Sequence, residues 1–203
     1  MSTPRDRAQR LREAARDDPD AVNPDRVLEL LRYPEREVQR VAAEAFLPLV
    51  TEHPEAGTGA VERLAYLLRT ADPERAADRE QAVAFMRTLL LCLARIASVA
   101  PEKALNARTE VLACLDDPSG PLAAPASVCL AQFMEAGPAS FIAHIDRFEA
   151  LLDAEEPTVR RNAAHILAQL AGSHPGSVTS AMPTLGERLT DPDTETAKKS
   201  ALV

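Results

Sequence analysis

Apolar positions along this chain recur with the spacing of α-helices, and one helical pattern occurs twice. Residues 38–46 read VQRVAAEAF and residues 159–167 read VRRNAAHIL, at a constant offset of 121 residues. Each copy places Val first, two small residues one turn later and larger apolar residues on the following turn, which describes one face of an α-helix. Each copy also continues to a His-Pro pair, at residues 53–54 and 174–175. The chain therefore contains an internal repeat that is built from helices.

Two sets of prolines divide the chain into alternating helices. One set follows the ends of apolar helices, and the other precedes the helices that come next. The first set is Pro19, Pro54, Pro101, Pro138 and Pro175, and the second set is Pro34, Pro73, Pro118, Pro157 and Pro192. Asp72 and Asp191 each stand directly before a proline of the second set. We expect each of these aspartates to cap a helix that begins at the proline.

Together the two patterns predict an all-α chain of paired helices. A first helix spans 4–16, with Thr3 as its N-cap. Helix pairs follow at 24–32 with 35–51, 58–70 with 74–100, 102–115 with 121–136, 139–153 with 158–172, and 177–190 with 193 onward. We expect a single domain over residues 1–203, with an incomplete repeat at 1–20, full repeats at about 24–54, 58–101, 102–138 and 139–175, and an unfinished repeat at 177–203.

The segment 157–167, its relative at 34–46 and the apolar stripe within 145–152 resemble the HEAT-repeat family of armadillo-type α-solenoids. The resemblance covers nearly the whole chain. It implies antiparallel helix pairs wound into a right-handed superhelix, with the second helix of each pair on the concave face. Neighbouring pairs would stack into one continuous core, because a single pair cannot bury its apolar stripe. The motif residues pack the core, so the resemblance specifies the fold and not the function.

Composition limits the classes of partner. The formal net charge is −8, and among the 23 basic residues only Lys103, Lys198 and Lys199 are lysine. An acidic, lysine-poor chain resembles the proteins of salt-loving microbes, although a GC-rich genome would also favour Ala, Arg, Asp and Pro. In either case the chain lacks the positive charge that general nucleic-acid binding requires.

The chain carries no signal of a membrane or secreted protein. Its first 16 residues are charged and contain no apolar segment, and its longest nearly uncharged run, residues 88–93, is too short to cross a bilayer. Cys92, Cys114 and Cys129 lie in apolar helical contexts, which indicates buried, reduced thiols rather than disulfides. We expect a soluble cytoplasmic protein.

A column of basic residues is the first candidate binding feature. Arg40, Arg87, Arg161 and Lys198 occupy equivalent positions in successive second helices, and only Ala124 interrupts the column. On a concave face they would form a cationic track for an acidic partner. The alternative is a ladder of ion pairs with acids in the connecting turns, such as Asp117, Asp153 and Asp191, which would need no partner.

An apolar strip in the central repeats is the second candidate. Alignment places Leu91 and Val128 where Glu44 and His165 stand in other repeats, at a position that should point away from the core. With Met86 nearby, they would form an exposed apolar strip, which usually marks a partner site. The alternative is that the second repeat's extra residues, 72–82, fold over the strip and bury it.

The sequence offers no catalytic, cofactor or metal site. The four histidines do not converge with other ligands at metal-binding spacing, and the chain has neither a Cys-x-x-Cys motif nor a glycine-rich phosphate loop. Carboxylates are abundant, but runs such as residues 116–117 fall in exposed turns, where nothing shifts their pKa values apart. We therefore expect neither catalysis nor a bound cofactor or metal.

The expected function is a non-enzymatic scaffold or adaptor that binds a protein or peptide on the concave face. One alternative is a helical-repeat enzyme, because some HEAT-like proteins are DNA glycosylases or bilin lyases. Those glycosylases are basic and use aromatic residues, whereas this chain is acidic and has no Trp. The other alternative is a structural module that self-associates through the apolar strip or through the C-terminal repeat, since residues 198–203 align with 161–166 and stop midway along the helix.

Overall fold

The computed structural model describes residues 2–203, and the regular elements of that range are all helical. Longer α-helices alternate with short 3₁₀ segments, which are labelled η here. Contacts between residues divide the chain into two compact units, 1–110 and 111–203, and each unit is described by itself. That the whole chain forms a single domain stays a prediction.

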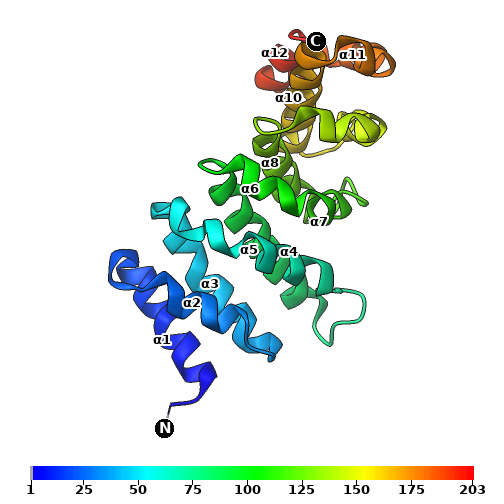
Figure 1. The fold of residues 1–203 in the computed structure, drawn as a ribbon. Coiled ribbons are helices and arrows are strands. Elements are labelled where there is room, and N and C mark those ends of the chain that lie inside the picture. Colours follow the sequence, from blue (N-terminus) through cyan, green and yellow to red (C-terminus); the bar gives the residue numbers. More distant parts are fainter. Residues whose placement is uncertain (1) are drawn as a thin grey trace. The chain divides into compact units, whose positions relative to one another are not determined.

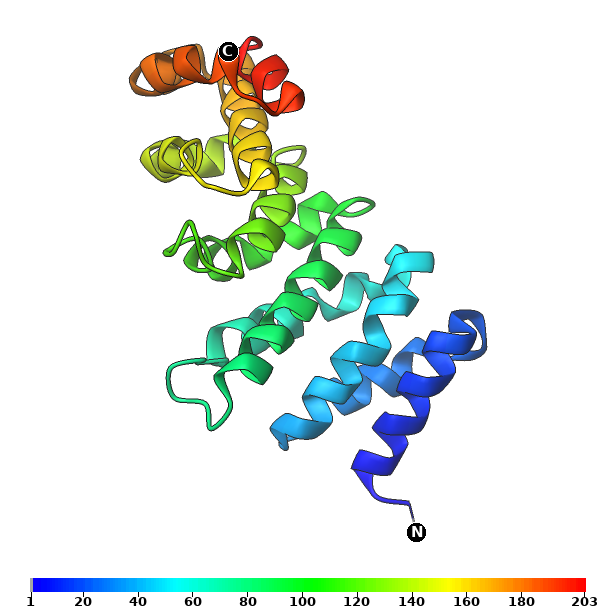
Figure 2. The same cartoon turned by 180° about the vertical axis from the view of Figure 1, so that it is seen from behind.

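The first unit has two layers of helices (Figures 1 and 2). Its second-helix layer contains α1 (Pro4–Asp17), α3 (Arg36–Glu52) and α5 (Arg79–Ala97), with α3 in contact with both neighbours. The first-helix layer contains α2 (Pro24–Leu31), which packs on α3, and α4 (Val61–Thr70), which packs on α5. The remaining elements are η1 (Pro19–Ala21), η2 (Pro54–Ala60), α6 (Pro101–Ala104) and η3 (Leu105–Ala107). Helix α7 (Arg108–Ala113) runs from this unit into the next.

The second unit repeats the arrangement around α10 (Pro157–Ser173). This helix lies between α8 (Ala123–Phe133) and α12 (Thr194–Ser200), and the three form the second-helix layer of this unit. The opposite layer contains α9 (Ile145–Leu151) and α11 (Met182–Glu187), together with η4 (Pro138–His144), η5 (Pro175–Ala181) and η6 (Arg188–Thr190). Helix α9 packs on both α10 and η5, so adjacent pairs are joined through both layers.

The predicted helix pairs are present, but the predicted helices 58–70, 139–153 and 177–190 begin as the 3₁₀ segments η2, η4 and η5 and become α-helical only at residues 61, 145 and 182. The N-terminus matches closely. Thr3 accepts a hydrogen bond from the backbone N–H of Asp6, and the Asp6 carboxylate accepts one from the N–H of Thr3. This reciprocal capping box satisfies two N–H groups that the first turn of a helix leaves without partners.

The predicted caps at Asp72 and Asp191 are wrong. Helix α5 begins at residue 79 with Asp78 as its N-cap, and α12 begins at residue 194 with Asp193 as its N-cap. Asp72 instead accepts hydrogen bonds from the backbone within the 71–78 loop, and Asp191 is buried. A proline after an aspartate permits a turn as readily as a helix start, so the Asp-Pro pair alone did not distinguish the two.

Small side chains allow the second helices to pack closely. Ala42, Ala43 and Ala45 of α3 are fully buried, as are Ala163 and Ala164 of α10. The larger apolar groups fill the space between layers, and the biggest fully buried side chains are Phe46, Phe133, Phe141 and Phe148. The repeated small pair that identified the repeat therefore sets the separation between helices.

Gly57 marks the tightest approach in the first unit. A Cβ atom added there would lie 2.7 Å from side-chain carbons of both Val50 and Ile96. Gly59, two residues on in the same 3₁₀ segment, has nothing within 4 Å of the equivalent position. No glycine among the described residues has a positive φ, so the requirement at Gly57 is one of space.

We predict that Gly57→Ala lowers the free energy of unfolding by about 1–3 kcal/mol, because the added methyl group overpacks the core against Val50 and Ile96. Gly59→Ala is the matched control and should be neutral or slightly stabilising, by less than about 1 kcal/mol. Urea unfolding followed by circular dichroism measures both. Equal stability of the two variants would contradict the packing of η2 against α3 and α5.

Candidate functional site

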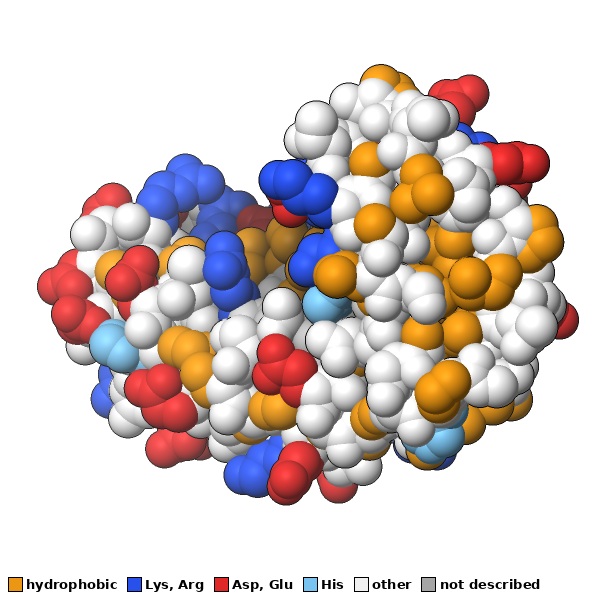
Figure 3. Space-filling view, turned by 90° about the horizontal axis from the view of Figure 1, so that it is seen from above, with side chains coloured by type: hydrophobic (Ala, Val, Ile, Leu, Met, Phe, Trp, Pro, Cys, Tyr) orange, Lys and Arg blue, Asp and Glu red, His pale blue; other side chains and the backbone are white. Residues whose placement is uncertain are grey.

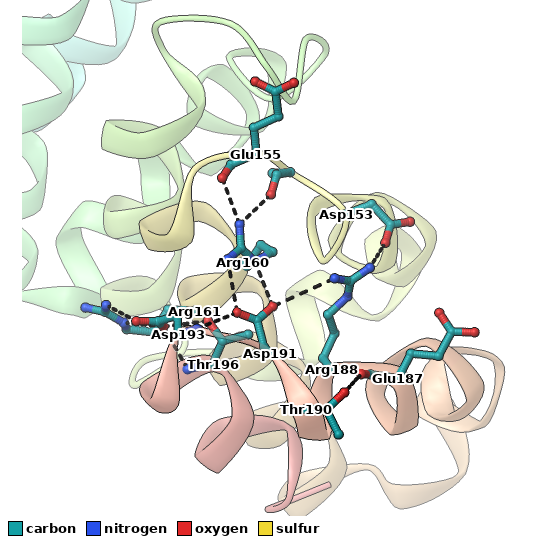
Figure 4. Close-up of polar contacts among 11 residues, drawn as sticks. Asp153, Glu155, Arg160, Arg161, Glu187, Arg188, Thr190, Asp191, Asp193 and Thr196 are labelled. Carbon is teal, nitrogen blue, oxygen red and sulfur yellow. Dashed lines mark hydrogen bonds and ion pairs between the residues drawn. The ribbon is translucent and has the colours of Figure 1, made fainter.

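A buried ion pair joins the last two repeats of the second unit (Figure 4). The Arg160 guanidinium donates two hydrogen bonds to the Asp191 carboxylate, with Nε–Oδ2 at 2.8 Å and Nη2–Oδ1 at 3.0 Å. The Nη1 group of Arg160 donates to the backbone carbonyls of Ala154 and Glu155, each at 2.8 Å. The side chain of Asp191 is 0% exposed and that of Arg160 is 10% exposed. Every charge in this pair is thus matched by a partner of fixed geometry.

The environment of Asp191 stabilises its charged form. The two hydrogen bonds from Arg160 hold the pKa of the Asp191 carboxyl below its usual range, against the opposing effect of burial. The backbone N–H of Asp193 adds a third hydrogen bond, at 2.9 Å. Asp191 therefore joins α10 to the turn before α12.

The burial of Arg160 shows which position of the repeated second-helix pattern faces the core. Arg160 is equivalent to Gln39 and Met86 by the repeat offsets, and all three are buried. Sequence reasoning selected the following position, that of Arg161, and did not identify Arg160. The doubled arginine at 160–161 was the available signal, since its two members must point in different directions on a helix.

Three members of the predicted basic column form ion pairs, but not with the predicted acids. Arg40 pairs with Glu37 at 2.8 Å and also with Glu44, both on its own helix. Arg161 pairs with Asp193 at 2.9 Å, and Lys198 with Glu195 at 2.8 Å. These interactions raise the pKa of the Arg40, Arg161 and Lys198 side chains, and the largest cause is the hydrogen bond that each side chain donates to its acid.

The fourth member, Arg87, differs. It is exposed, and its side chain makes no hydrogen bond or ion pair with any residue in the described range 2–203. Of the turn acids proposed as partners, Asp191 binds the buried Arg160, Asp153 pairs with Arg188, and Asp117 accepts a hydrogen bond from the N–H of Ser119. The basic column therefore does not form ion pairs with those three acids.

The three residues of the predicted apolar strip differ in their exposure to solvent. Met86 is only 8% exposed, because it occupies the inward position that Gln39 and Arg160 share. Leu91 lies in the first unit and Val128 in the second, and each is partly exposed. The insertion does not bury Leu91. Whether Leu91 and Val128 serve one partner stays a prediction.

Of the extra residues of the second repeat, 72–78 form a loop and 79–82 belong to the first turn of α5. Residues 71–78 border a hollow of about 770 Å³, together with the N-terminal ends of α3 and α5 and the end of α4. Arg36 lies at this hollow: it donates to the carbonyl of Thr70 at 2.9 Å and to Gln39 Oε1 at 3.1 Å, and it stacks on Phe85 with its guanidinium carbon 5.8 Å from the ring centre. These contacts fix Arg36 in place with neutral acceptors.

A smaller hollow of about 250 Å³ opens on the second-helix layer of the first unit. Its lining comes from all three helices of that layer: Arg12 and Arg16 from α1, Glu44, Leu47 and Pro48 from α3, and Thr88 from α5. Pro48 lies inside α3 and has no N–H, so the Glu44 carbonyl lacks its usual helical donor. Sequence reasoning did not single out this hollow, although a proline within the predicted 35–51 helix was a signal for it.

The charges of this layer are unevenly matched. Arg12 reaches across from α1 to Glu44 at 2.8 Å, and Arg5 reaches Glu37 at 3.3 Å. Both glutamates are already held by Arg40, so the two acids are shared among three arginines. Figure 3 shows the side chains coloured by type. In that view acidic side chains lie around the edge, and several Lys and Arg side chains lie in the upper left part.

Histidine, cysteine and carboxylate side chains are the groups that could hold a metal or supply reactive chemistry. Among residues 2–203, no group of three or more His, Cys, Asp or Glu could hold a metal ion. Burial raises the pKa of the Cys92 thiol and raises that of Cys114 to about 11, which disfavours the reactive thiolate in both. His53 contacts Asp20, whose hydrogen bond raises the histidine pKa. No helix in the described part of the chain is long and apolar enough to span a bilayer.

Comparison with solved structures shows the fold. An engineered protein superposes with a TM-score of 0.78 at 24% identity, covering 96% of this chain and 86% of its own. A computationally designed armadillo repeat protein made for modular peptide recognition superposes at 0.74 with 19% identity, covering 96% and 89%. The chain thus has an all-helical repeat fold like that of these engineered and designed armadillo repeat proteins.

A third similar structure contains a ligand. This designed armadillo repeat protein, in complex with the peptide (KR)4, superposes with a TM-score of 0.70 at 19% identity, covering 96% of this chain and 87% of its own. No protein-family model matches the sequence, and no curated protein matches it.

We predict that Asp191→Asn destabilises the protein by about 3 kcal/mol, because it leaves the buried Arg160 charge unmatched. Asp153→Asn is the control: its carboxylate is 64% exposed and pairs with Arg188, so its loss should cost about 0.5 kcal/mol. Urea unfolding at neutral pH compares the two. Similar effects for both variants would show that the Arg160–Asp191 pair does not bear on stability.

The same pair gives a pH dependence. Because folding lowers the pKa of Asp191, its stabilisation is complete above the ordinary carboxyl pKa of about 3.9 and is lost as the pH falls below that value. The double variant Arg160→Met/Asp191→Leu lacks this contribution. Its unfolding midpoint should fall less steeply than that of the parent protein between about pH 5 and pH 2. Parallel curves would refute the assignment.

Proposed function

We propose that this protein is a non-enzymatic scaffold that binds a protein or peptide on its second-helix layer. A helical repeat fold supports the proposal, since stacked helices present an extended surface rather than an enclosed reaction centre. Two of the similar solved structures add support: one was made for peptide recognition, and the other is a complex with a peptide. Binding, and no bond-making step, is the role assigned to the surface.

The observation that carries the proposal is the partly exposed Leu91 on α5. Its equivalents in other repeats are Glu44 and His165, so a polar residue is compatible with this position. One turn before Leu91 stands the unpaired Arg87, and Thr88 lines the hollow shared with α1 and α3. A partner could cover the apolar side chain of Leu91 with an apolar group of its own and place an acidic group beside Arg87.

Val128 supplies a second, separate point of contact in the same proposal. It stands at the Leu91 position of the next repeat, on α8, and is likewise partly exposed. Arg161 on α10 belongs to the same layer but is held by Asp193. We assign it a smaller role than Arg87, because a partner would have to displace an existing ion pair.

We expect Leu91→Asp or Val128→Asp to reduce partner recovery at least tenfold in affinity purification with mass spectrometry from native cells. A buried carboxylate would have to be desolvated at the interface, which opposes binding. Val99→Asp and Leu189→Asp are matched controls: each parent side chain is 50% exposed, and neither residue lies in the helices of the second-helix layer. Circular dichroism should show unchanged helicity in all four variants.

Partner recovery that is unchanged in both Leu91→Asp and Val128→Asp would remove the second-helix layer as the binding surface. Recovery that falls only in the control variants would move the site to the other layer.

A further inference from the structure

One surface of the first unit concentrates arginines within an otherwise acidic chain. We call the set Arg12, Arg16, Arg40, Arg87 and Arg95 the arginine face. Arg12 and Arg16 come from α1, Arg40 from α3, and Arg87 and Arg95 from α5. The ion pairs of Arg12 and Arg40 with Glu44 join the first two helices, and the hollow that Thr88 shares with Arg12 and Arg16 joins the third.

The arginine face carries positive charge that the protein does not neutralise. Two acids of this face, Glu37 and Glu44, are held by Arg5, Arg12 and Arg40. Asp20 and Glu52 line a hollow together with Arg16, and neither forms an ion pair with Arg16. Arg16, Arg87 and Arg95 are exposed, and their side chains make no ion pair with any residue from 2 to 203. Their charges remain available, whereas the net charge of the chain is −8.

Apolar surface lies among these charges. Leu47, Pro48 and Leu91 are each partly exposed, and Leu47 and Pro48 line the hollow directly. On α5, residues 88, 91 and 95 follow one another at the spacing that places side chains on one side of a helix. The surface thus alternates guanidinium groups with aliphatic patches.

We infer that the arginine face binds an acidic, extended peptide segment that carries apolar residues between its carboxylates. This inference rests on the proposed function and names the chemistry of the partner. Carboxylates would pair with Arg16, Arg87 and Arg95, which need not break an existing ion pair. Apolar residues of the segment would cover Leu91 and enter the hollow at Leu47 and Pro48.

The dimensions are compatible with a short segment. Three helices packed side by side span about 18 Å between the outer axes. An extended peptide covers about 3.3 Å per residue, so about six residues cross the layer. At physiological salt the Debye length is about 8 Å, so the nearby arginines dominate over acids elsewhere on the molecule.

A nucleic acid is the other polymer that would pair with arginines. Duplex DNA carries one charge per about 1.7 Å of its axis, so it would meet long-range repulsion from a protein of net charge −8, and no nucleic acid supplies aliphatic side chains that would cover Leu91. A peptide with separated carboxylates meets less of this repulsion and also supplies apolar groups. The peptide is therefore the occupant that the surface favours.

The test is fluorescence anisotropy with the whole chain and three labelled probes of equal length: the acidic peptide (DE)4, the basic peptide (KR)4, and the oligonucleotide dT8. The net charge of the protein favours (KR)4, whereas the arginine face favours (DE)4. We expect (DE)4 to bind most tightly at low salt, with an affinity that falls as salt is added. Inserting two leucines into (DE)4 should tighten binding further.

Arg87→Glu and Arg16→Glu should each weaken (DE)4 binding about tenfold. Arg108→Glu is the matched control, because Arg108 belongs to the same unit, is exposed, and makes no ion pair among the described residues, but lies outside the second-helix layer. It should leave binding within about twofold.

Equal weakening by Arg108→Glu would show a general charge effect and overturn the inference. Tighter binding of (KR)4 or of dT8 than of (DE)4 would also overturn it. In either case, loss of the native partner on Leu91→Asp would still support the proposed function. The proposed function and the acidic-peptide inference can therefore fail separately.

Discussion

Close packing between second helices is the constraint on which the rest of this structure depends. Buried alanines on α3 and α10 let each helix approach its neighbours on both sides, and the phenylalanines then fill the space between layers. A larger residue on the alanine stripe would separate the helices and open the core. The same limit on space appears at Gly57, where a methyl group would meet Val50 and Ile96.

Once the helices are fixed at this separation, the outward positions of the second-helix layer form a surface that is free to vary. In the first unit it carries shared ion pairs, unpaired arginines and an exposed leucine, whereas in the second unit Arg161 and Lys198 are each paired with an acid. The two units share the same pattern of core packing, but their outward surfaces differ in how the charges are paired. Differences of this kind, laid on a repeated core, are where a scaffold acquires a preference for one partner.

The buried Arg160–Asp191 pair stands apart from these surface charges. Its two groups are almost fully removed from water, so the pair stabilises the fold only if all its hydrogen-bonding groups have partners. The carbonyls of 154 and 155 and the N–H of Asp193 provide those partners. In the first repeat the equivalent Gln39 reaches the carbonyl of Tyr33, at 2.5 Å, and in the second repeat Met86 fills the position without a polar group. The same inward site thus accepts a charged, a polar or an apolar side chain, provided that its hydrogen bonds are met.

The sequence alone determined the helical repeat, its pairs and the small residues of its core, because these follow from local spacing and from proline positions. It also indicated that 72–82 and the central repeats were irregular. Only the tertiary structure decided that 71–78 is a loop at the ends of α3 and α5, that Met86 points inward, and that Asp191 binds Arg160. It also decided that the Arg87 side chain forms no ion pair within residues 2–203. These outcomes depend on contacts between residues about thirty or more positions apart, such as Arg160 with Asp191 and Arg12 with Glu44. Local periodicity cannot fix them, since it specifies which side of a helix a residue occupies and not which group it meets there.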